Sequence, residues 1–199
     1  SLVHDGLWDP YGDKHMGNCA EVCAREYKLT REEQDAFSRE SYARARAAQE
    51  GGLFAGEIVP FEIVSRKGTS VVDRDEEPGK SDLEKMAGLK PAFEKDGTVT
   101  AANASKINDG AAALVLATGE EVKRLGVKPI ARLISQASHA QQPEWFTTAP
   151  VAAIRKALDR AGLTVADIDL FEINEAFAVV ALACMRDLGI AHEQLNVRG

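Results

Sequence analysis

The stretch DLFEINEAFAVVALAC, residues 169–184, places Asn174 and Glu175 between two apolar runs. The shorter run has the length of a covered strand and the longer one that of a helix. The pattern therefore predicts a strand over 168–173 followed by a helix over 175–189. In open α/β sheets, ligands bind beyond the carboxyl ends of the strands. Asn174 is thus either the N-cap of that helix or a site residue that points into a crevice.

Glu175 and a second polar segment can likewise have either a structural role or a role in binding a ligand. Glu175 is either a first-turn carboxylate suited to the helix dipole or, if buried, a candidate acid or orienting acceptor. The segment ANASKINDG, residues 102–110, precedes an apolar run, and its small residues would let a ligand approach closely. Its polar residues could bind that ligand or form a tight turn through side-chain hydrogen bonds. These residues are Asn103, Ser105, Asn108 and Asp109.

The composition is that of a globular protein able to bury a core, with 199 residues, 45% hydrophobic and 28% charged. A net charge of −7 is unsuited to non-specific nucleic-acid binding, so we expect no nucleic-acid partner. Three cysteines are an odd number, so we expect no disulfide framework and a cytoplasmic location. No apolar run approaches the length of a membrane span, and the first residues do not read as a secretory signal, so we expect no membrane partner.

The first hundred residues predict an α+β unit rather than a repeating βα pattern. Capping boxes of Thr30 with Glu33 and of Ser81 with Glu84 mark two helix starts. The predicted elements are helices over 20–27, 31–50 and 81–89 and strands over 56–65 and 69–75, after a loop over 1–18.

The second half predicts alternating strands and helices, which is typical of an α/β layer with helices packed on a sheet. The run AAALVLA at 111–117 is unbroken, as in a strand covered on both faces. Thr118 with Glu121 caps the helix that follows. The predicted strands lie over 111–117, 129–137 and 168–173, and the predicted helices over 119–126, 149–162 and 175–189.

His15, Cys19 and Cys23 are spaced four apart, which places them on one face of a helix. Such spacing admits a metal site or a Cys–His nucleophile pair. No fourth ligand is apparent, and the two cysteines lie among Ala and Val like small buried hydrophobes. We therefore predict no metal site, and we predict that Cys184 lies in the core.

Taken together, the motifs resemble those of the thiolase family, in particular its short-chain biosynthetic acetyl-CoA acetyltransferase branch. INDGAAA and NEAFA in one chain are highly specific, and the resemblance covers essentially all 199 residues. The matching motifs, in the family's order, are DGL at 5–7, HMGNCAE at 15–21, EEQDAF at 32–37, EIVPFEI at 57–63, KPAFEKDGTVTAANAS at 90–105, INDGAAA at 107–113 and NEAFA at 174–178.

The resemblance implies a partial thiolase-like αβαβα layered core with an α+β loop domain. Residues 1–107 resemble the loop domain that covers coenzyme A. Residues 108–129 resemble the end of the N-terminal core domain, and residues 130–199 the start of the C-terminal core domain. Because the chain starts at Ser1 and stops at Gly199, we expect it to be the middle half of a longer protein.

The resemblance also implies site residues. Asn174 resembles the asparagine that holds a water in the oxyanion hole for the enolate of acetyl-CoA. His15 and Met16 resemble the pair that lines the short-acyl pocket, and Ser105 the residue near the pantetheine. The full set of implied substrate-binding residues is Leu7, His15, Met16, Phe93, Ser105, Phe146, Ala176 and Phe177.

The implied reaction is ping-pong condensation of two acetyl-CoA to acetoacetyl-CoA, or the reverse cleavage, through an acyl-cysteine intermediate. No cofactor or metal is implied, because the coenzyme A thioester is the substrate. The family's two catalytic cysteines and its Gly-His-Pro histidine match nothing here, so we expect the chain alone to be inactive. We expect a dimer or tetramer for the full enzyme. The alternatives are a noncatalytic coenzyme A-binding or interaction fragment and a 3-ketoacyl-CoA thiolase of longer chain specificity.

Several positions depart from the family pattern. Pro78 stands where an arginine often contacts a coenzyme A phosphate, and Lys80, Lys85 or Arg66 could substitute for it. Lys106 replaces a small residue and could narrow the pantetheine channel or reach a phosphate. Two further departures are Phe146, where a methionine is common, and Arg198, where an asparagine is common.

Overall fold

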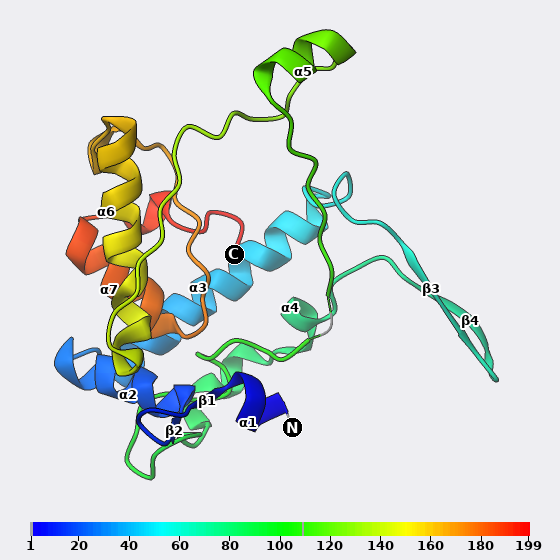
Figure 1. The fold of residues 1–199 in the computed structure, drawn as a ribbon. Helices are drawn as coiled ribbons and strands as arrows, with labels where there is room; N and C mark the ends of the chain where they lie inside the picture. The colour runs from blue at the N-terminus through cyan, green and yellow to red at the C-terminus, as the bar shows by residue number, and fades with distance from the viewer. Residues whose placement is uncertain (1, 109) are drawn as a thin grey trace.

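The computed structural model describes residues 2–108 and 110–199, so the expectations for Ser1 and Asp109 lie outside the described residues. Four helices pack into a helical body (Figure 1). They are α2 (Met16–Glu26), α3 (Arg31–Glu50), α6 (Ala149–Ala161) and α7 (Ala178–Leu188). The central helix is α7, which contacts the other three. Its side chains Val179, Ala181, Ala183 and Cys184 are fully buried, so the core lies around this helix and Cys184 belongs to it, as predicted.

The first residues form more regular structure than the predicted loop. They comprise α1 (Leu2–Gly6) and the paired strands β1 (Trp8–Asp9) and β2 (Lys14–His15). Helix α2 begins at Met16 because His15 caps it. The Nδ1 atom of His15 accepts the amide hydrogen of Gly17 at 2.9 Å, and Asn18 Oδ1 accepts that of His15 at 3.2 Å. The loop prediction for 1–18 is therefore wrong, because a helix and a strand pair occupy much of this segment and the His15 side chain starts α2 at Met16.

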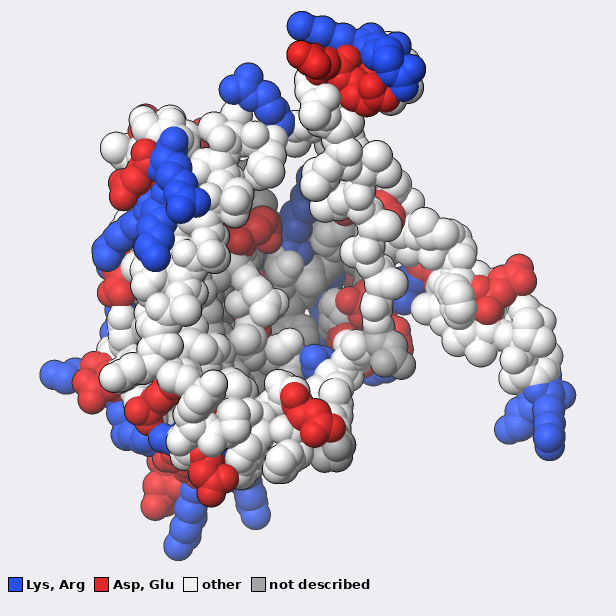
Figure 2. All heavy atoms as spheres, viewed as in Figure 1, with Lys and Arg blue, Asp and Glu red and all other residues white. Residues whose placement is uncertain are grey.

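The Thr30–Glu33 capping box is confirmed at the start of α3. Beyond α3, β3 (Phe61–Ser65) and β4 (Gly68–Val72) form an antiparallel hairpin that extends away from the helical body (Figure 1). Every residue of both strands is exposed, and Figure 2 shows basic side chains at the hairpin tip. Both strands are shorter than predicted.

Two short helices follow the hairpin, α4 (Glu77–Lys80) and the 3-10 helix η1 (Leu83–Gly88). Asp82, rather than Ser81, caps η1, because its side chain accepts the amide hydrogen of Glu84. The predicted capping box of Ser81 with Glu84 is therefore wrong.

The strands predicted over 111–117 and 129–137 do not pair with any part of the chain that the structure describes. Leu114, Val115 and Leu116 are more than four-fifths exposed. A strand needs a neighbour to complete its backbone hydrogen bonds, and these segments have none here. Between them, α5 (Gly119–Leu125) is capped by Thr118 as predicted. The remaining 3-10 helices are η2 (Pro143–Thr148), η3 (Val165–Asp167) and η4 (His192–Gln194).

The predicted strand over 168–173 is reduced to one parallel bridge between Phe171 and Leu195. After it, α7 begins at Ala178 rather than at residue 175, and its N-cap residue is Phe177. The later start has a non-local cause: Ala104, far away in the sequence, forms an antiparallel bridge with Phe177 and keeps this residue extended. The interpretation of Asn174 as a helix N-cap is therefore wrong. None of the helices in the described residues combines the length and apolar character needed to cross a bilayer.

Candidate functional site

Asn174 lies on the extended segment before α7, where it lines two adjoining hollows. The polar hollow, of about 560 Å³, lies between α3, the segment around Ser105 and the segment around Asn174. The apolar hollow, of about 300 Å³, is lined by Phe146, Ala176 and side chains of α6 and α7. The Asn174 side chain is exposed and accepts or donates no hydrogen bond among the described residues. Its carboxamide is therefore free to bind a water molecule or a substrate oxygen at the boundary of the two hollows.

A row of four aromatic rings runs beside Asn174. His15 stacks on Phe93 with ring centres 4.8 Å apart, and Phe93 meets Phe177 edge-to-face at 6.0 Å. Phe146 lies 6.4 Å from Phe177 at the other end of the row. Four predicted binding residues, from four separate segments, therefore come together. Burial lowers the pKa of His15, so its imidazole is neutral in this row near neutral pH.

Main-chain hydrogen bonds bring the other predicted residues to the same place. The amide of Ser105 donates to the carbonyl of Ala176 at 2.9 Å, and the amide of Met16 donates to the carbonyl of Leu7 at 2.9 Å. Met16 packs against the core together with Ala176. Ser105 is exposed at the polar hollow, which leaves its hydroxyl accessible to a ligand.

A close approach fixes Phe93 over the start of α2. A Cβ atom added at Gly17 would lie 2.3 Å from the Phe93 ring, far inside van der Waals contact. The glycine of the HMG motif therefore leaves room for the Phe93 ring. This contact explains why a glycine stands between residues that line a pocket.

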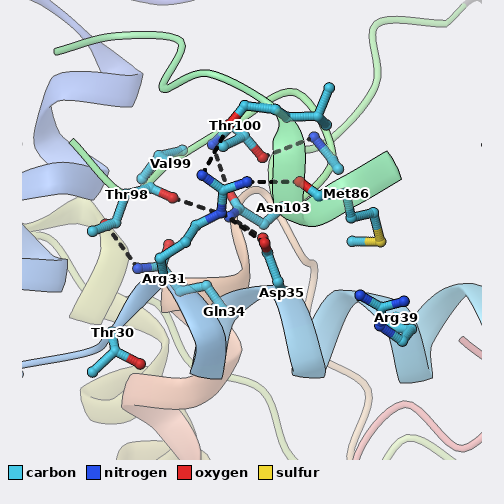
Figure 3. A network of polar contacts seen from close by, with 12 residues as sticks. Thr30, Arg31, Gln34, Asp35, Arg39, Met86, Thr98, Val99, Thr100 and Asn103 are labelled. Carbon is cyan, nitrogen blue, oxygen red and sulfur yellow. Dashed lines mark hydrogen bonds and ion pairs between the residues drawn. The ribbon is translucent and has the colours of Figure 1, made fainter. Parts of the chain in front are cut away.

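A buried polar network holds the segment that carries Ser105 (Figure 3). Asp35 on α3 pairs with Arg31 at 2.7 Å and accepts a hydrogen bond from Asn103 Nδ2 at 3.0 Å. Asn103 Oδ1 accepts the amide hydrogen of Thr100 at 2.7 Å. This is the kind of side-chain hydrogen bond expected if the segment forms a tight turn. The carbonyl of Asn103 then accepts the amide hydrogen of Ala178 at 2.9 Å. The network thus joins α3 to the first residue of α7.

Glu21 secures the same segment from α2. Its carboxylate is 1% exposed and accepts the amide hydrogens of Thr98 and Val99 at 2.8–3.0 Å and the Thr98 hydroxyl at 3.1 Å. A buried carboxylate is tolerated when such donors satisfy it.

Glu175 is not a first-turn carboxylate, because α7 begins three residues later. One carboxylate oxygen accepts the Ser41 hydroxyl at 2.7 Å, and the other accepts Asn196 Nδ2 at 2.7 Å. Both oxygens are thus occupied by protein donors. This arrangement matches the orienting acceptor rather than the acid.

The three cysteines are fully buried thiols in the helical body. Burial raises the pKa of Cys19 and of Cys23, and it raises the pKa of Cys184 to about 12. Such thiols are poor nucleophiles near neutral pH, because the thiolate is the reactive form. Among residues 2–108 and 110–199, no group of three or more His, Cys, Asp or Glu could hold a metal ion.

Three basic residues could replace the phosphate-binding arginine that the family often has at Pro78, and the structure places them differently. Lys80 pairs with Glu77 at 2.7 Å, Lys85 pairs with Asp82 at 2.8 Å, and Arg66 belongs to the hairpin tip. Only Lys106, of the described residues lining the polar hollow, carries a positive charge. Its Nζ atom donates to the carbonyl of Ala101 at 2.7 Å. The remaining departure, Arg198, approaches Glu57 at 3.9 Å.

Comparison with known proteins identifies the family. The model of the thiolase N-terminal domain matches residues 1–120, and that of the thiolase C-terminal domain matches residues 127–199. The acetyl-CoA acetyltransferase of Yarrowia lipolytica is 53% identical over the whole chain, and acetyl-CoA acetyltransferase 2 of Arabidopsis thaliana is 52% identical. The chain spans about half the length of the curated relatives it matches, 50% in both cases.

Solved structures agree with the sequence relatives. The Bacillus anthracis acetyl-CoA acetyltransferase is 43% identical, with a TM-score of 0.94 over 97% of this chain and 49% of its own. The Acat5 thiolase from Ascaris suum, solved in complex with coenzyme A, is 46% identical, with a TM-score of 0.93 over 100% of this chain and 51% of its own. These matches confirm the predicted partial α/β thiolase core. The chain belongs to the thiolase family.

Proposed function

We propose that this chain supplies the coenzyme A-binding surface and one oxyanion-binding residue of an acetyl-CoA C-acetyltransferase. The complete enzyme would condense two acetyl-CoA to acetoacetyl-CoA or cleave that product with coenzyme A. Relatives of that name, about half identical over the whole chain, support the proposal. The Ascaris suum thiolase complex with coenzyme A supports the ligand class.

The observation that carries the proposal is the unbonded carboxamide of Asn174 between the polar and apolar hollows. A donor that is fixed in place and not used by the protein can stabilise charge that develops on a substrate oxygen. Asn174 would hold a water against the thioester oxygen as the acetyl-CoA enolate forms. The aromatic row with Met16 would wall the acyl group, and Ser105 would contact the pantetheine.

The covalent step requires a cysteine from elsewhere in the complete protein. All three thiols of this chain have pKa values raised by burial, so none forms a thiolate readily. Acyl transfer to a more acidic cysteine splits the reaction into two easier steps. The proposal includes no metal or redox cofactor, a cytoplasmic location and a homo-oligomeric complete enzyme.

The test uses a complete protein made by joining this chain in frame to the flanking segments of the Yarrowia lipolytica relative, called the chimera below. We expect the chimera to cleave acetoacetyl-CoA and the isolated chain to show no turnover. Asn174→Ala should lower kcat by about a hundredfold, the scale for losing one oxyanion donor. Gln142→Ala removes an exposed carboxamide that caps nothing and should leave kcat unchanged.

The alternatives give different results. Coenzyme A binding by the chimera without any turnover would favour a noncatalytic binding module. Faster cleavage of 3-ketooctanoyl-CoA than of acetoacetyl-CoA would favour a thiolase of longer chain specificity. An Asn174→Ala variant with the kinetics of the parent chimera would remove Asn174 from the mechanism.

A further inference from the structure

The Asn196 side chain occupies the place of a neighbouring strand. It is 5% exposed, and its backbone is left-handed with a φ of 46°. Its Oδ1 atom accepts the amide hydrogen of Ile173 at 2.8 Å, and its Nδ2 atom donates to the carbonyl of Ile173 at 2.8 Å. One carboxamide thus makes both hydrogen bonds that a strand would offer Ile173. The next residue along the chain is Asn174.

The main chain explains why a side chain takes this role. The amide of Phe171 donates to the carbonyl of Gln194 at 2.8 Å, and the amide of Asn196 donates to the carbonyl of Phe171 at 2.9 Å. If the parallel pairing of the two segments continued, a main-chain group after Asn196 would bond Ile173. The backbone instead turns away from Ile173 at Asn196, which has a left-handed conformation. The carboxamide of Asn196 continues the pairing for one more residue.

Helix α3 holds both sides of this pairing. Arg44 Nη1 donates to the carbonyls of His192 at 3.0 Å and Leu195 at 2.8 Å. On the other side, Glu175 is held by the Ser41 hydroxyl and by Asn196 Nδ2, both at 2.7 Å. Ile173 therefore has both main-chain groups bonded and Glu175 has both carboxylate oxygens bonded, whereas the side chain of Asn174 is unbonded among the described residues.

We infer that Asn196 is a positioning residue that sets the place and direction of the Asn174 carboxamide. The inference rests on the proposed function and assigns no substrate contact to Asn196. A shift of about 1 Å in a reacting group can cost about a hundredfold in rate, so a side chain that fixes the segment next to Asn174 acts on turnover. Asn196 lines the polar hollow, but its carboxamide is bonded to Ile173 and Glu175, so we expect a change there to affect substrate binding less than turnover.

The test is made in the chimera with Asn196→Asp. This isosteric change keeps the acceptor for the amide of Ile173 and tolerates the left-handed backbone. It places an oxygen against the carbonyl of Ile173 and the carboxylate of Glu175, where Asn196 Nδ2 now donates. We expect kcat for acetoacetyl-CoA cleavage to fall at least tenfold, with KM changed less than about twofold. Adding Glu175→Gln restores one donor and should recover part of the loss.

A double-mutant cycle separates positioning from general damage. In the Asn174→Ala background, Asn196→Asp should change kcat less than about twofold, because the group being positioned is gone. Asn196→Gly keeps the left-handed turn without adding a charge and should show the same pattern. Gln194→Ala, whose side chain bonds the carbonyl of Ile168 instead, is the matched control and should leave kcat unchanged.

Two results would overturn the inference while leaving the proposed function intact. One is an active chimera in which Asn196→Asp and Asn196→Gly keep kcat within twofold. The other is the same fractional loss of kcat with and without Asn174. A chimera without thiolytic activity would instead count against the proposed function.

Discussion

Two apolar runs of similar composition, AVVALAC at 178–184 and AAALVLA at 111–117, have opposite surroundings in this molecule. The first forms α7 and is buried at the centre of the helical body, where Val179 is 0% exposed. The second is extended and open, and Val115 is 98% exposed. A helix completes its backbone hydrogen bonds internally, whereas a strand needs a neighbour. Apolar character therefore indicates that a segment is suited to burial. A helix can be buried by packing against other helices, whereas a strand also needs a paired strand, which this chain does not supply for 111–117 among the described residues.

The largest change in the free energy of unfolding is expected for a substitution in the packed region, and it tests the contrast with the open region. Glu21→Ala in the chimera leaves the buried amide of Val99 and the half-buried amide of Thr98 without acceptors. We expect the free energy of unfolding, measured by urea titration, to fall by about 3–5 kcal/mol.

The matched control is Glu62→Ala on the exposed hairpin strand β3, where a change of less than about 0.5 kcal/mol is expected. Equal losses at Glu21 and Glu62 would contradict the assignment of Glu21 as a structural anchor.

A smaller effect is expected at Val115, and it tests whether the complete protein covers the open run. Val115→Thr keeps the shape of the side chain and adds a hydroxyl. If 111–117 becomes a covered strand in the chimera, the buried hydroxyl should cost about 1–3 kcal/mol in the free energy of unfolding. A cost below about 0.5 kcal/mol would mean that this run stays in water, and the strand prediction would then be wrong there as well.

The smallest effect concerns pH. Burial lowers the folded-state pKa of His15, and its Nδ1 must be unprotonated to accept the amide hydrogen of Gly17. Folding thus favours the neutral imidazole, whose unfolded pKa is about 6.5. The resulting stability is fully present above about pH 6.5 and is lost as the pH falls through the unfolded pKa towards the folded one.

His15→Asn keeps a capping oxygen without a titrating group. Between about pH 7.5 and about pH 5, its free energy of unfolding should therefore fall less than that of the parent chimera. His192, whose pKa burial also lowers, is present in both proteins and cancels from the difference. Parallel pH profiles would show that His15 contributes nothing.

The helices were predictable where their signals are local. Thr30 and Thr118 cap α3 and α5 through bonds to residues three positions away. The start of α7 was not predictable from such signals, because a bridge to Ala104, far away in the sequence, keeps Phe177 extended. The strands over 111–117 and 129–137 were predicted from apolar character, which cannot say which segment pairs with them.

The site was predictable only in part. The family motifs contain Asn174, His15, Phe93 and Phe177, and the structure places the three rings in a row that Phe146, a departure from the family pattern, completes. The motif EEQDAF includes Asp35, but nothing local indicates that it bonds Asn103. The carboxamide of Asn196 was missed because a residue near the end of a turn reads as a surface polar residue. Its burial against Ile173 depends on contacts more than twenty residues apart.

The absence of a side chain at Gly17 limits how the surface around Phe93 and His15 can be redesigned. The Phe93 ring occupies the volume that any larger residue at 17 would need. Replacing Phe93 with a smaller residue opens space on that side of His15, and only then does position 17 tolerate a methyl group. Libraries that aim to reshape the surface beside His15 should therefore vary 17 and 93 as one joint choice, since any residue larger than glycine at 17 requires a smaller residue at 93.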